Sequence, residues 1–362
     1  MIRILHAADL HLDSPFAALA PGQAAQRREE QRQLILRLTR ICTERDCQLL
    51  LLAGDLFDSA LVYRETLELL CEALGSVRAR VFIAPGNHDP WSPSSPYATL
   101  SWPENVHIFR SRRIEAIRLR EPAVTVYGAA FSDAHSGSLL PGFRADPDDA
   151  ASVMVLHGTL GEPSSVYNPI SEQDVLDSGL DYLALGHVHK LKLRRIGGVT
   201  AANPGCAMGR GFDETGPKGA LYAELDGGSC RVEPVPLGGR AYETLTVHIE
   251  DSDALASIEA QLPAGTGRDI YRVTLTGSCP PPELPALYAA LSGRFYTLEL
   301  VDRTLPPQAL WDGAAEDNLK GEFLRRLRAR FEAEQNQETR RIAANAARLG
   351  LALMERREVP EL

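Results

Sequence analysis

In the first 190 residues, short apolar runs repeatedly end at polar clusters, and this pattern limits the folds available to the chain. Five such runs stand out: Ile2–Ala8, Leu49–Ala53, Val81–Ala84, Val153–Leu156 and Tyr182–Leu185. Continuous apolar runs of four to seven residues are typical of strands that are buried on both faces. Segments with helical character, residues 26–47 and 63–74, lie between them. Alternating strands and helices predict an α/β fold with a layered core.

The polar clusters at the ends of these runs contain seven side chains with oxygen or nitrogen donors: Asp9, His11, Asp55, Asn87, His157, His187 and His189. Ligand sites in α/β sheets gather beyond the carboxyl ends of the strands, so we expect these side chains to converge. A mixed imidazole and carboxylate set without a thiolate favours manganese, iron or zinc over calcium or magnesium. Seven ligands exceed what one cation normally takes from a protein. The sequence therefore predicts two divalent cations.

Such a site suits the hydrolysis of phosphate esters. Two divalent cations, the carboxylates of Asp9 and Asp55 and a bridging hydroxide together leave a small positive charge, which attracts a phosphodiester even on an acidic protein. His88 is flanked by Asn87 and Asp89. We predict that His88 lies at the rim and donates a proton to the leaving or a non-bridging oxygen. Asp89 is expected to set the tautomer of His88 and to raise its pKa.

Composition bears on which surfaces, compartment and membrane contacts the protein can have. The 38 Lys and Arg residues against 48 Asp and Glu give a net charge of −10, which counts against a broadly basic nucleic-acid-binding surface. The six cysteines contain no C-x-x-C pair and are typical of reduced thiols in a cytosolic protein. The start, MIRILHAADLH, lacks the apolar segment of a signal peptide, and no apolar stretch approaches the ~20 residues of a membrane span. We therefore expect a cytoplasmic protein without membrane contact.

The pattern changes near the Gly238-Gly239 pair, which predicts a hinge. We assign residues 1–239 to the first domain. Residues 240–310 follow a β-α-β-α-β pattern and form a small second domain. Residues 311–362 form a helical tail, in which residues 316–354 contain no proline and favour one long helical tract. Four apolar residues recur at a spacing of four along this tract: Leu319, Phe323, Leu327 and Phe331.

The ordered motifs also carry a resemblance. D-x-H, GD, GNHD, H-G and GHVH follow one another over residues 9–189 and resemble the signature of the calcineurin-like metallophosphoesterase superfamily. Within it, ILHAADLHLDSPF at 4–16 and NPGCAMGRGF at 203–212 are similar to the SbcD and YhaO group of DNA repair exonucleases. The resemblance covers essentially the whole chain. It implies a four-layer α-β-β-α core, a small α+β capping domain and a C-terminal helical tail.

The resemblance assigns roles to individual residues. It implies that one cation, most simply Mn²⁺, is held by Asp9, His11, Asp55 and His189. The second cation is held by Asp55, Asn87, His157 and His187, with Asp55 as the bridge, and His88 is the catalytic histidine. Asn203 departs from the pattern, because many relatives of SbcD have a tyrosine before the Pro-Gly. The substrate contacts of that loop are therefore less well defined than the metal ligands.

The leading hypothesis is a metal-dependent DNA exonuclease, and also an endonuclease, that acts in DNA repair. The resemblance further implies an SbcC-like coiled-coil ATPase as partner through the C-terminal helix, and a homodimer. One alternative is a phosphoesterase that acts on a small nucleotide or a phosphoprotein. Another is a scaffold that regulates an ATPase.

Several features allow two interpretations. The basic segment 190–195 is either a charged edge strand or a contact for a phosphate backbone. The same choice holds for Arg110, Arg112 and Arg113, where solvated charges are favoured. The apolar stripe of the tail either packs on its own domain or binds a partner helix. The remaining side chains of interest are expected to be structural: Asp13, Asp58, His6, His107, His135 and His248.

Overall fold

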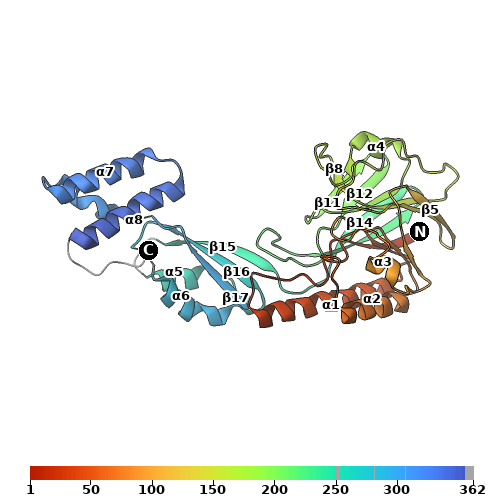
Figure 1. Cartoon of the computed structure of the whole chain (residues 1–362), viewed down its shortest axis with the longest axis horizontal. Helices are drawn as coiled ribbons and strands as arrows, with labels where there is room; N and C mark the ends of the chain where they lie inside the picture. Colours follow the sequence, from red (N-terminus) through yellow and green to blue (C-terminus); the bar gives the residue numbers. More distant parts are fainter. Residues whose placement is uncertain (250–252, 281, 306, 355–362) are drawn as a thin grey trace. The chain divides into compact units, whose positions relative to one another are not determined.

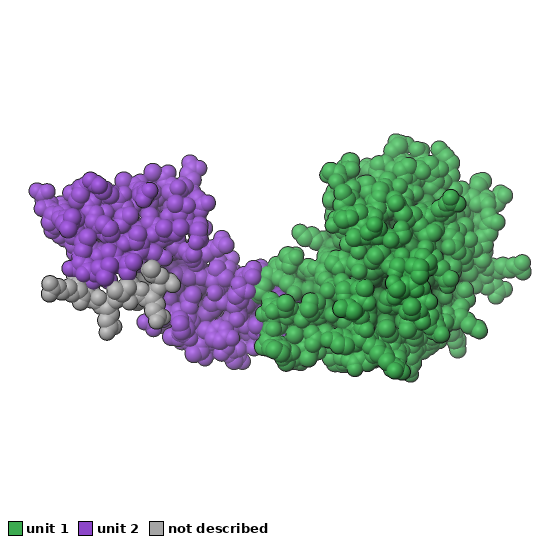
Figure 2. Space-filling model, in the orientation of Figure 1, with its two compact units in different colours: residues 1–241 green, residues 242–362 purple. Residues whose placement is uncertain are grey.

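The computed structural model describes residues 1–249, 253–280, 282–305 and 307–354. The chain divides into two compact units, Met1–Ala241 and Tyr242–Leu362 (Figure 2). The first unit ends two residues beyond the domain boundary that the sequence predicts. The predicted capping domain and tail fall together in the second unit, and residues 355–362 of the tail lie outside the described residues.

The first unit contains two six-stranded sheets (Figure 1). In the first sheet the order is β14 (Ser229–Pro236), β13 (Gly219–Asp226), β1 (Ile2–Ala7), β2 (Leu49–Leu52), β3 (Arg80–Ile83) and β4 (Val106–Ile108). Strands β1 to β4 are parallel, whereas β13 and β14 are antiparallel to their neighbours. The carboxyl ends of β1, β2 and β3 therefore lie at one edge.

The second sheet also has four parallel strands and two antiparallel ones, but the antiparallel strands lie at its two edges. Its order is β11 (Lys192–Ile196), β12 (Val199–Asn203), β10 (Tyr182–Gly186), β7 (Ser152–His157), β6 (Ala123–Gly128) and β5 (Glu115–Arg120). The four central strands are parallel, and β11 and β5 are antiparallel edges. A short ribbon of β8 (Thr159–Leu160) and β9 (Pro169–Ile170) follows β7. The carboxyl ends of β7 and β10 lie together because the two strands are parallel neighbours.

The apolar runs are buried on both faces, as the sequence predicts. In β2, Leu50 and Leu52 pack against the cluster that includes α1 (Pro21–Glu44) and α2 (Arg64–Ser76), whereas Leu49 and Leu51 pack between the sheets. The outer face of the second sheet is covered by α4 (Glu172–Asp177) and by loop residues near Leu140. The expected α-β-β-α layering is confirmed. Its fourth layer is thin, because α4 has only six residues.

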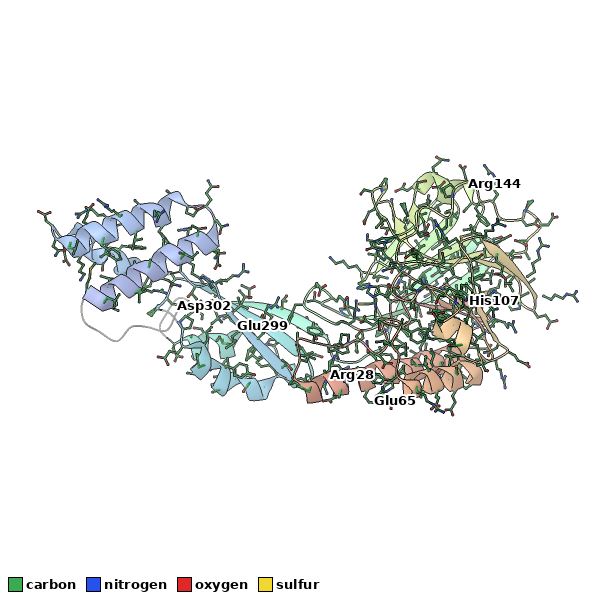
Figure 3. All side chains as sticks on the ribbon, in the orientation of Figure 1. Arg28, Glu65, His107, Arg144, Glu299 and Asp302 are labelled. Atoms are coloured by element: carbon green, nitrogen blue, oxygen red, sulfur yellow. The ribbon has the colours of Figure 1, made fainter. Side chains whose placement is uncertain are left out.

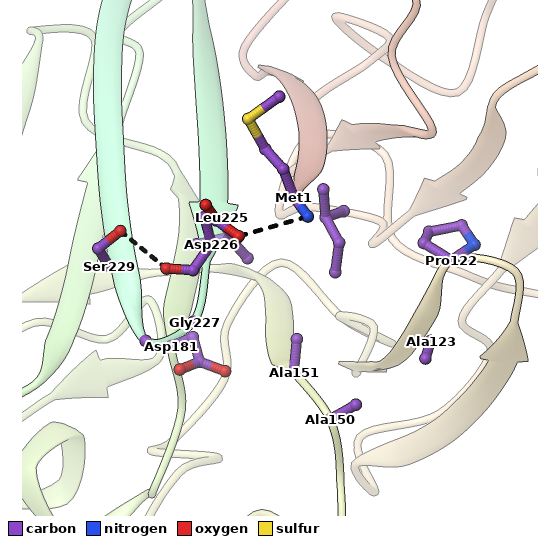
Figure 4. A pocket seen from close by; sticks show the side chains of 12 residues that line it. Met1, Pro122, Ala123, Ala150, Ala151, Asp181, Leu225, Asp226, Gly227 and Ser229 are labelled. Atoms are coloured by element: carbon purple, nitrogen blue, oxygen red, sulfur yellow. Dashed lines mark hydrogen bonds and ion pairs between the residues drawn. The ribbon is translucent and has the colours of Figure 1, made fainter.

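Two further features complete the first unit. Helix α3 (Pro96–Thr99) is a single turn that follows the GNHD motif. A cavity of about 270 Å³ lies at the amino ends of the strands, where Met1, Pro122, Asp181 and Asp226 line it (Figure 4). Because the predicted ligands follow the carboxyl ends of the strands, this cavity is at the opposite edge from them.

The second unit begins with a parallel three-stranded sheet of β15 (Tyr242–Ile249), β16 (Ile270–Gly277) and β17 (Thr297–Asp302). Helices α5 (Ala254–Gln261) and α6 (Leu284–Leu291) connect the strands and pack against the sheet. The 3₁₀ turns η1 (Thr266–Arg268) and η2 (Ser292–Arg294) lie in the same connections. The structure therefore has the β-α-β-α-β order that the sequence predicts.

The tail is helical, as the sequence predicts, and its two helices form a hairpin. After the 3₁₀ segment η3 (Gln308–Ala315), α7 (Leu319–Ala333) and α8 (Gln337–Met354) are separated by a turn. Asn336 caps the start of α8, because its Oδ1 accepts hydrogen bonds from the backbone N–H groups of Glu338 and Thr339. Gly350 allows α8 to approach α7 closely, since a Cβ at this position would lie 2.2 Å from the ring of Phe323.

The apolar stripe of the tail is largely used inside this hairpin. Phe323, Leu327 and Phe331 pack in a cluster with Trp311 and the alanines of α8. Leu319 is the exception, with 77% of its surface exposed. Within the described part of the chain, no helix is long and apolar enough to cross a membrane.

Candidate metal centre

The seven predicted ligands meet where the carboxyl edges of the two sheets face each other. Strands β1, β2 and β3 of the first sheet deliver Asp9, His11, Asp55 and Asn87, and strands β7 and β10 of the second sheet deliver His157, His187 and His189. Asp9, His11, Asp55 and His157 are at most 1% exposed. Their convergence confirms the spatial expectation drawn from the strand ends.

One group of donors consists of Asp9, His11 and His189, whose ligand atoms lie within 4.8 Å of one another. The Nε2 atoms of His11 and His189 are 3.2 Å apart. Oδ1 of Asp9 lies 4.0 Å from Nε2 of His189. This spacing leaves room for one cation among the three side chains.

The second group consists of Asp55, His157 and His187, with Asn87 between the two imidazoles. Oδ1 of Asn87 lies 2.9 Å from Nε2 of His157 and 3.0 Å from Nδ1 of His187. These two groups are the sets that the resemblance assigns to the two cations. Asp55 joins them, because its Oδ2 lies 3.4 Å from Nε2 of His157 and 3.7 Å from Nε2 of His11.

The tautomers of the histidines test whether cations fit the site. Nδ1 of His157 donates to the carbonyl oxygen of Ala53 at 2.9 Å, and Nδ1 of His189 donates to Oε1 of Glu214 at 2.6 Å. Nδ1 of His11 faces Oδ1 of Asp58 at 3.2 Å. In neutral imidazoles with this arrangement the Nε2 atoms carry lone pairs, and these lone pairs converge on one another and on carboxylate oxygens. Divalent cations relieve that repulsion, so the donor set fits two metal ions.

The backbone is strained at four of the predicted ligands. The φ values are 51° at Asp9, 44° at His11, 49° at Asp55 and 94° at His187. Residues other than glycine rarely adopt this region of backbone conformation. Strain of this kind, on the order of 1–3 kcal/mol per residue, persists where the surrounding structure imposes it and is common at functional sites. Gly54 is required for a different reason, because a Cβ there would lie 2.3 Å from Nδ1 of His157.

Burial and neighbouring charges shift the pKa values of several side chains at the site. Burial raises the pKa of Asp9 to about 7. Burial opposes protonation of His157, but the carboxylates of Asp55 and Asp9 outweigh it and raise the pKa of His157 to about 9. Burial lowers the pKa of His11 and of His187 to about 4, so both rings are neutral near pH 7 and available as ligands. Burial also raises the pKa of the Cys206 thiol to about 12, so the thiol is protonated near pH 7.

His88 lies at the rim, as predicted, but the role predicted for Asp89 is wrong. Nδ1 of His88 contacts the carbonyl oxygen of Asp58 at 3.1 Å, and its backbone N–H donates to Oδ1 of Asp55. The carboxylate of Asp89 is buried and accepts hydrogen bonds from the backbone N–H groups of Gly86 and Phe57 and from the hydroxyl of Tyr97. All of these contacts order the GNHD loop, so Asp89 is a structural residue.

Two polar residues beside the centre were missed by the sequence reasoning. Glu214 is 5% exposed and holds His189, and Arg210 bridges Glu214 and Asp58. Arg210 lies in the NPGCAMGRGF segment and Glu214 lies two residues after it. Their i,i+4 spacing is the sequence pattern from which an ion pair could have been predicted. Asp58 has the loop-ordering position that the sequence predicts, since it faces both His11 and Arg210.

Aromatic rings extend outward from His187. The ring of Tyr167 lies 4.5 Å from that of His187, and the ring of His135 stacks on Tyr167 at 5.6 Å. The loops that carry them are joined, because the backbone N–H of Ser136 donates to the carbonyl oxygen of Val166 at 3.0 Å. His135 was expected to be structural, and the structure instead places it at the exposed end of this row of rings.

Comparison with known proteins identifies the family. The family described as calcineurin-like phosphoesterase matches residues 2–191, just over half of the chain. The chain belongs to this family. Members of this phosphoesterase family bind two divalent metal ions, in agreement with the two groups of donors.

Two curated relatives are similar over the same region. The uncharacterized metallophosphoesterase YhaO of Bacillus subtilis (strain 168) is 32% identical over 248 residues, which are 64% of this chain and 59% of YhaO. The DNA double-strand break repair protein Mre11 of Methanopyrus kandleri is 27% identical over 256 residues, which are 63% of this chain and 55% of that protein. The chain thus spans somewhat more than half the length of each. A known structure described as a novel archaeal phosphodiesterase is 13% identical, with a TM-score of 0.36 over 65% of this chain and 100% of the other.

Proposed function

We propose that this phosphoesterase is a metal-dependent DNA nuclease that hydrolyses phosphodiester bonds in DNA repair. The observation that carries the proposal is the pair of donor sets that share Oδ2 of Asp55. Paired divalent cations supply a nucleophile at neutral pH and neutralise the charge that develops on a phosphodiester. Similarity to a protein named for DNA double-strand break repair supports DNA as the substrate.

The residues of the chain have separate tasks in this proposal. Asp9, His11, His189 and Asp55 would hold one cation, and Asp55, Asn87, His157 and His187 would hold the other. Because Nδ1 of His88 is engaged by the carbonyl oxygen of Asp58, Nε2 is the nitrogen left to face the substrate. In its protonated form His88 donates from Nε2 to the leaving oxygen. The donor chemistry of the site is well suited to Mn²⁺.

The row of aromatic rings supports a substrate with bases. Bases stack on tyrosine and histidine side chains in proteins that bind single-stranded nucleic acid. Tyr167 and His135 offer such rings next to His187, which is a proposed metal ligand. A phosphoprotein phosphatase has no need of a stacking surface at this position.

A direct test compares linear double-stranded and single-stranded DNA with a small diester, bis-p-nitrophenyl phosphate, and with a phosphoprotein, all in Mn²⁺. The proposal expects release of nucleotides or fragments from DNA and slow hydrolysis of the small diester. Turnover of the phosphoprotein with inert DNA would favour a protein phosphatase. Absence of turnover on all substrates, with two bound metal ions, would favour a scaffold.

We also propose that the tail binds a coiled-coil ATPase. The surface available for this contact lies on α8 and not on the predicted stripe, because Ile342 and Leu353 are each 60% exposed. Exposed apolar residues on an amphipathic helix are typical of helix-to-helix recognition. Ile342→Glu with Leu353→Glu should abolish ATPase binding and leave hydrolysis of the small diester unchanged. Retained binding in that variant would contradict the proposed surface.

A further inference from the structure

Three arginines lie in a four-residue turn directly after β4: Arg110, Arg112 and Arg113, with Ser111 between the first two. We refer to residues 110–113 as the arginine turn. His107 on β4, labelled in Figure 3, marks where the strand leads into it. All three arginines are exposed. Such a concentration of positive charge is unexpected on a chain with a net charge of −10.

These charges are uncompensated. Among the described residues, no carboxylate forms an ion pair with any of the three guanidinium groups. The other basic segment near the metal centre behaves differently, because on β11 Lys192 pairs with Glu162 at 3.7 Å and Arg194 pairs with Glu172. The side chains of β11 are thus those of a charge-protected edge strand, whereas the arginine turn offers free positive charge to a ligand.

Hydrogen bonds tie the arginine turn to the rim of the metal centre. The carbonyl oxygen of Ser111 accepts from the backbone N–H of Ala130 at 2.8 Å. The next residue, Phe131, donates its backbone N–H to the carbonyl oxygen of Pro85 at 3.0 Å, and its ring contacts that of His157 at 5.5 Å. Because β4 is parallel to β3, the turn also leaves the sheet at the edge where Asn87 and His88 lie. It is therefore a neighbour of the second group of donors.

The turn is ordered and lies beside the aromatic row. Oγ of Ser111 accepts a hydrogen bond from the backbone N–H of Arg113 at 3.2 Å, which fixes the path of the turn. The guanidinium of Arg112 reaches Gly137, since Nη2 lies 3.8 Å from where a Cβ on that glycine would stand. Gly137 is two residues from His135, the outer ring of the row. Positive charge and stacking rings thus lie on the same side of the centre.

We propose that the arginine turn binds the phosphate backbone of the nucleic-acid strand whose neighbouring phosphodiester occupies the metal centre. This inference rests on the proposed nuclease function and adds a substrate-positioning site to it. Guanidinium groups bind phosphate oxygens through paired hydrogen bonds, and such contacts set the register of a strand without reading its sequence. A local cluster of this kind allows an acidic protein to bind a polyanion.

The test replaces the three charges together, in the variant Arg110→Gln/Arg112→Gln/Arg113→Gln. We expect KM for a single-stranded oligonucleotide to rise at least about tenfold at moderate salt, because three phosphate contacts are lost. The slope of log affinity against log salt concentration should become shallower by about 2, at roughly 0.7 per phosphate contact. Hydrolysis of bis-p-nitrophenyl phosphate and the content of bound Mn²⁺ should stay at the values of the unsubstituted protein, since neither needs a second phosphate contact.

The matched control removes the same charge from the other basic segment, in Lys190→Gln/Lys192→Gln/Arg194→Gln. It should change the salt slope much less than the arginine-turn variant does. Equal changes in both triple variants, or an unchanged slope in the arginine-turn variant, overturn the inference while DNA cleavage by the unsubstituted protein still supports the nuclease function. A protein that hydrolyses the small diester but neither binds nor cuts DNA overturns the nuclease function itself, and the inference with it.

Discussion

Glu214 accepts a hydrogen bond from Nδ1 of His189 at 2.6 Å, across 25 positions of the sequence. The contact orients the imidazole with Nε2 toward His11 and fixes the tautomer that a metal ligand needs. Loss of such a partner typically weakens metal binding by roughly 10- to 100-fold. We expect Glu214→Ala to weaken one of the two Mn²⁺ sites by this factor and to leave the other nearly unchanged, as measured by calorimetric titration. Glu233→Ala, at a half-buried acidic residue that pairs with Arg45, is the control. Two unaltered sites in Glu214→Ala would contradict the assignment.

Oδ2 of Asp55 lies 3.7 Å from Nε2 of His11 and 3.4 Å from Nε2 of His157, one histidine of each group. Replacement of Asp55 by alanine removes a donor from each cation site at once. We expect Asp55→Ala to retain less than one equivalent of Mn²⁺ after gel filtration, against two for the unsubstituted protein. Asp13→Ala is the control, because the Asp13 carboxylate accepts hydrogen bonds from Tyr63 and Thr66 and belongs to neither group of metal donors. This variant should keep both Mn²⁺ ions. Two tightly bound ions in Asp55→Ala are incompatible with a bridging role.

In the proposed mechanism His88 donates a proton to the leaving oxygen of the substrate and does not coordinate the cations. His88→Gln should therefore bind two Mn²⁺ ions normally and reduce kcat on DNA by about 10²- to 10⁴-fold, the usual contribution of a general acid or base. A substrate with a good leaving group, such as p-nitrophenolate, should be much less affected, because its leaving oxygen needs no proton. An equal loss on both substrates would assign His88 to binding instead of proton donation.

The correction for Asp89 leads to a prediction about stability. Its carboxylate accepts from two backbone N–H groups and from the Tyr97 hydroxyl at 2.5 Å in a buried position. Asp89→Asn replaces one acceptor oxygen with an N–H group that faces these donors. We expect the free energy of unfolding to fall by about 1–3 kcal/mol, measured by urea denaturation. Tyr97→Phe should cost less, because it leaves the two backbone contacts in place.

His6 makes stability depend on pH. It is fully buried between Tyr182 and the carbonyl oxygen of Leu185, and burial lowers its pKa to about 3. The unfolded chain binds a proton at His6 below its ordinary pKa of 6.5, whereas the folded chain does not. Stability from this residue is thus complete above pH 6.5 and falls by up to about 1.4 kcal/mol per pH unit below it. His6→Gln should flatten urea-denaturation stability between pH 6.5 and 4.5 relative to the unsubstituted protein, whereas an unchanged slope would exclude His6 as the source.

The parts of the fold that the sequence predicted are those with strong local signals. Runs such as Leu49–Ala53 are buried on both faces, so their apolar character alone identifies them as strands. The edge strand β5 was not predicted, and β11 was only one of two interpretations of residues 190–195, because their exposed residues, for example Arg118 and Arg194, obscure the pattern. The turn between α7 and α8 was not predicted either, because Asn336 caps the start of α8 by hydrogen bonds and neither proline nor glycine marks the position.

At the candidate site, too, strong local patterns could be predicted from the sequence, whereas contacts made by folded loops could not. Asp9 and His187 could be predicted to meet, because motif order and the strand ends place them at one sheet edge. The contacts that orient them could not, because Glu214 and Asp58 act through side-chain geometry that depends on the folded loops. Asp89 was misassigned because adjacency in sequence to His88 does not determine which groups a buried carboxylate contacts.

Each group of donors takes members from both six-stranded sheets, so any cation held there is a cross-link between the two halves of the sandwich. Its binding free energy adds to the cohesion of the first unit, in proportion to the logarithm of metal concentration over its dissociation constant. When a chelator removes the ions, the folding of each sheet is therefore less tightly coupled to the packing of the two sheets against each other. Heat denaturation of the first unit should lose cooperativity as the ions are withdrawn.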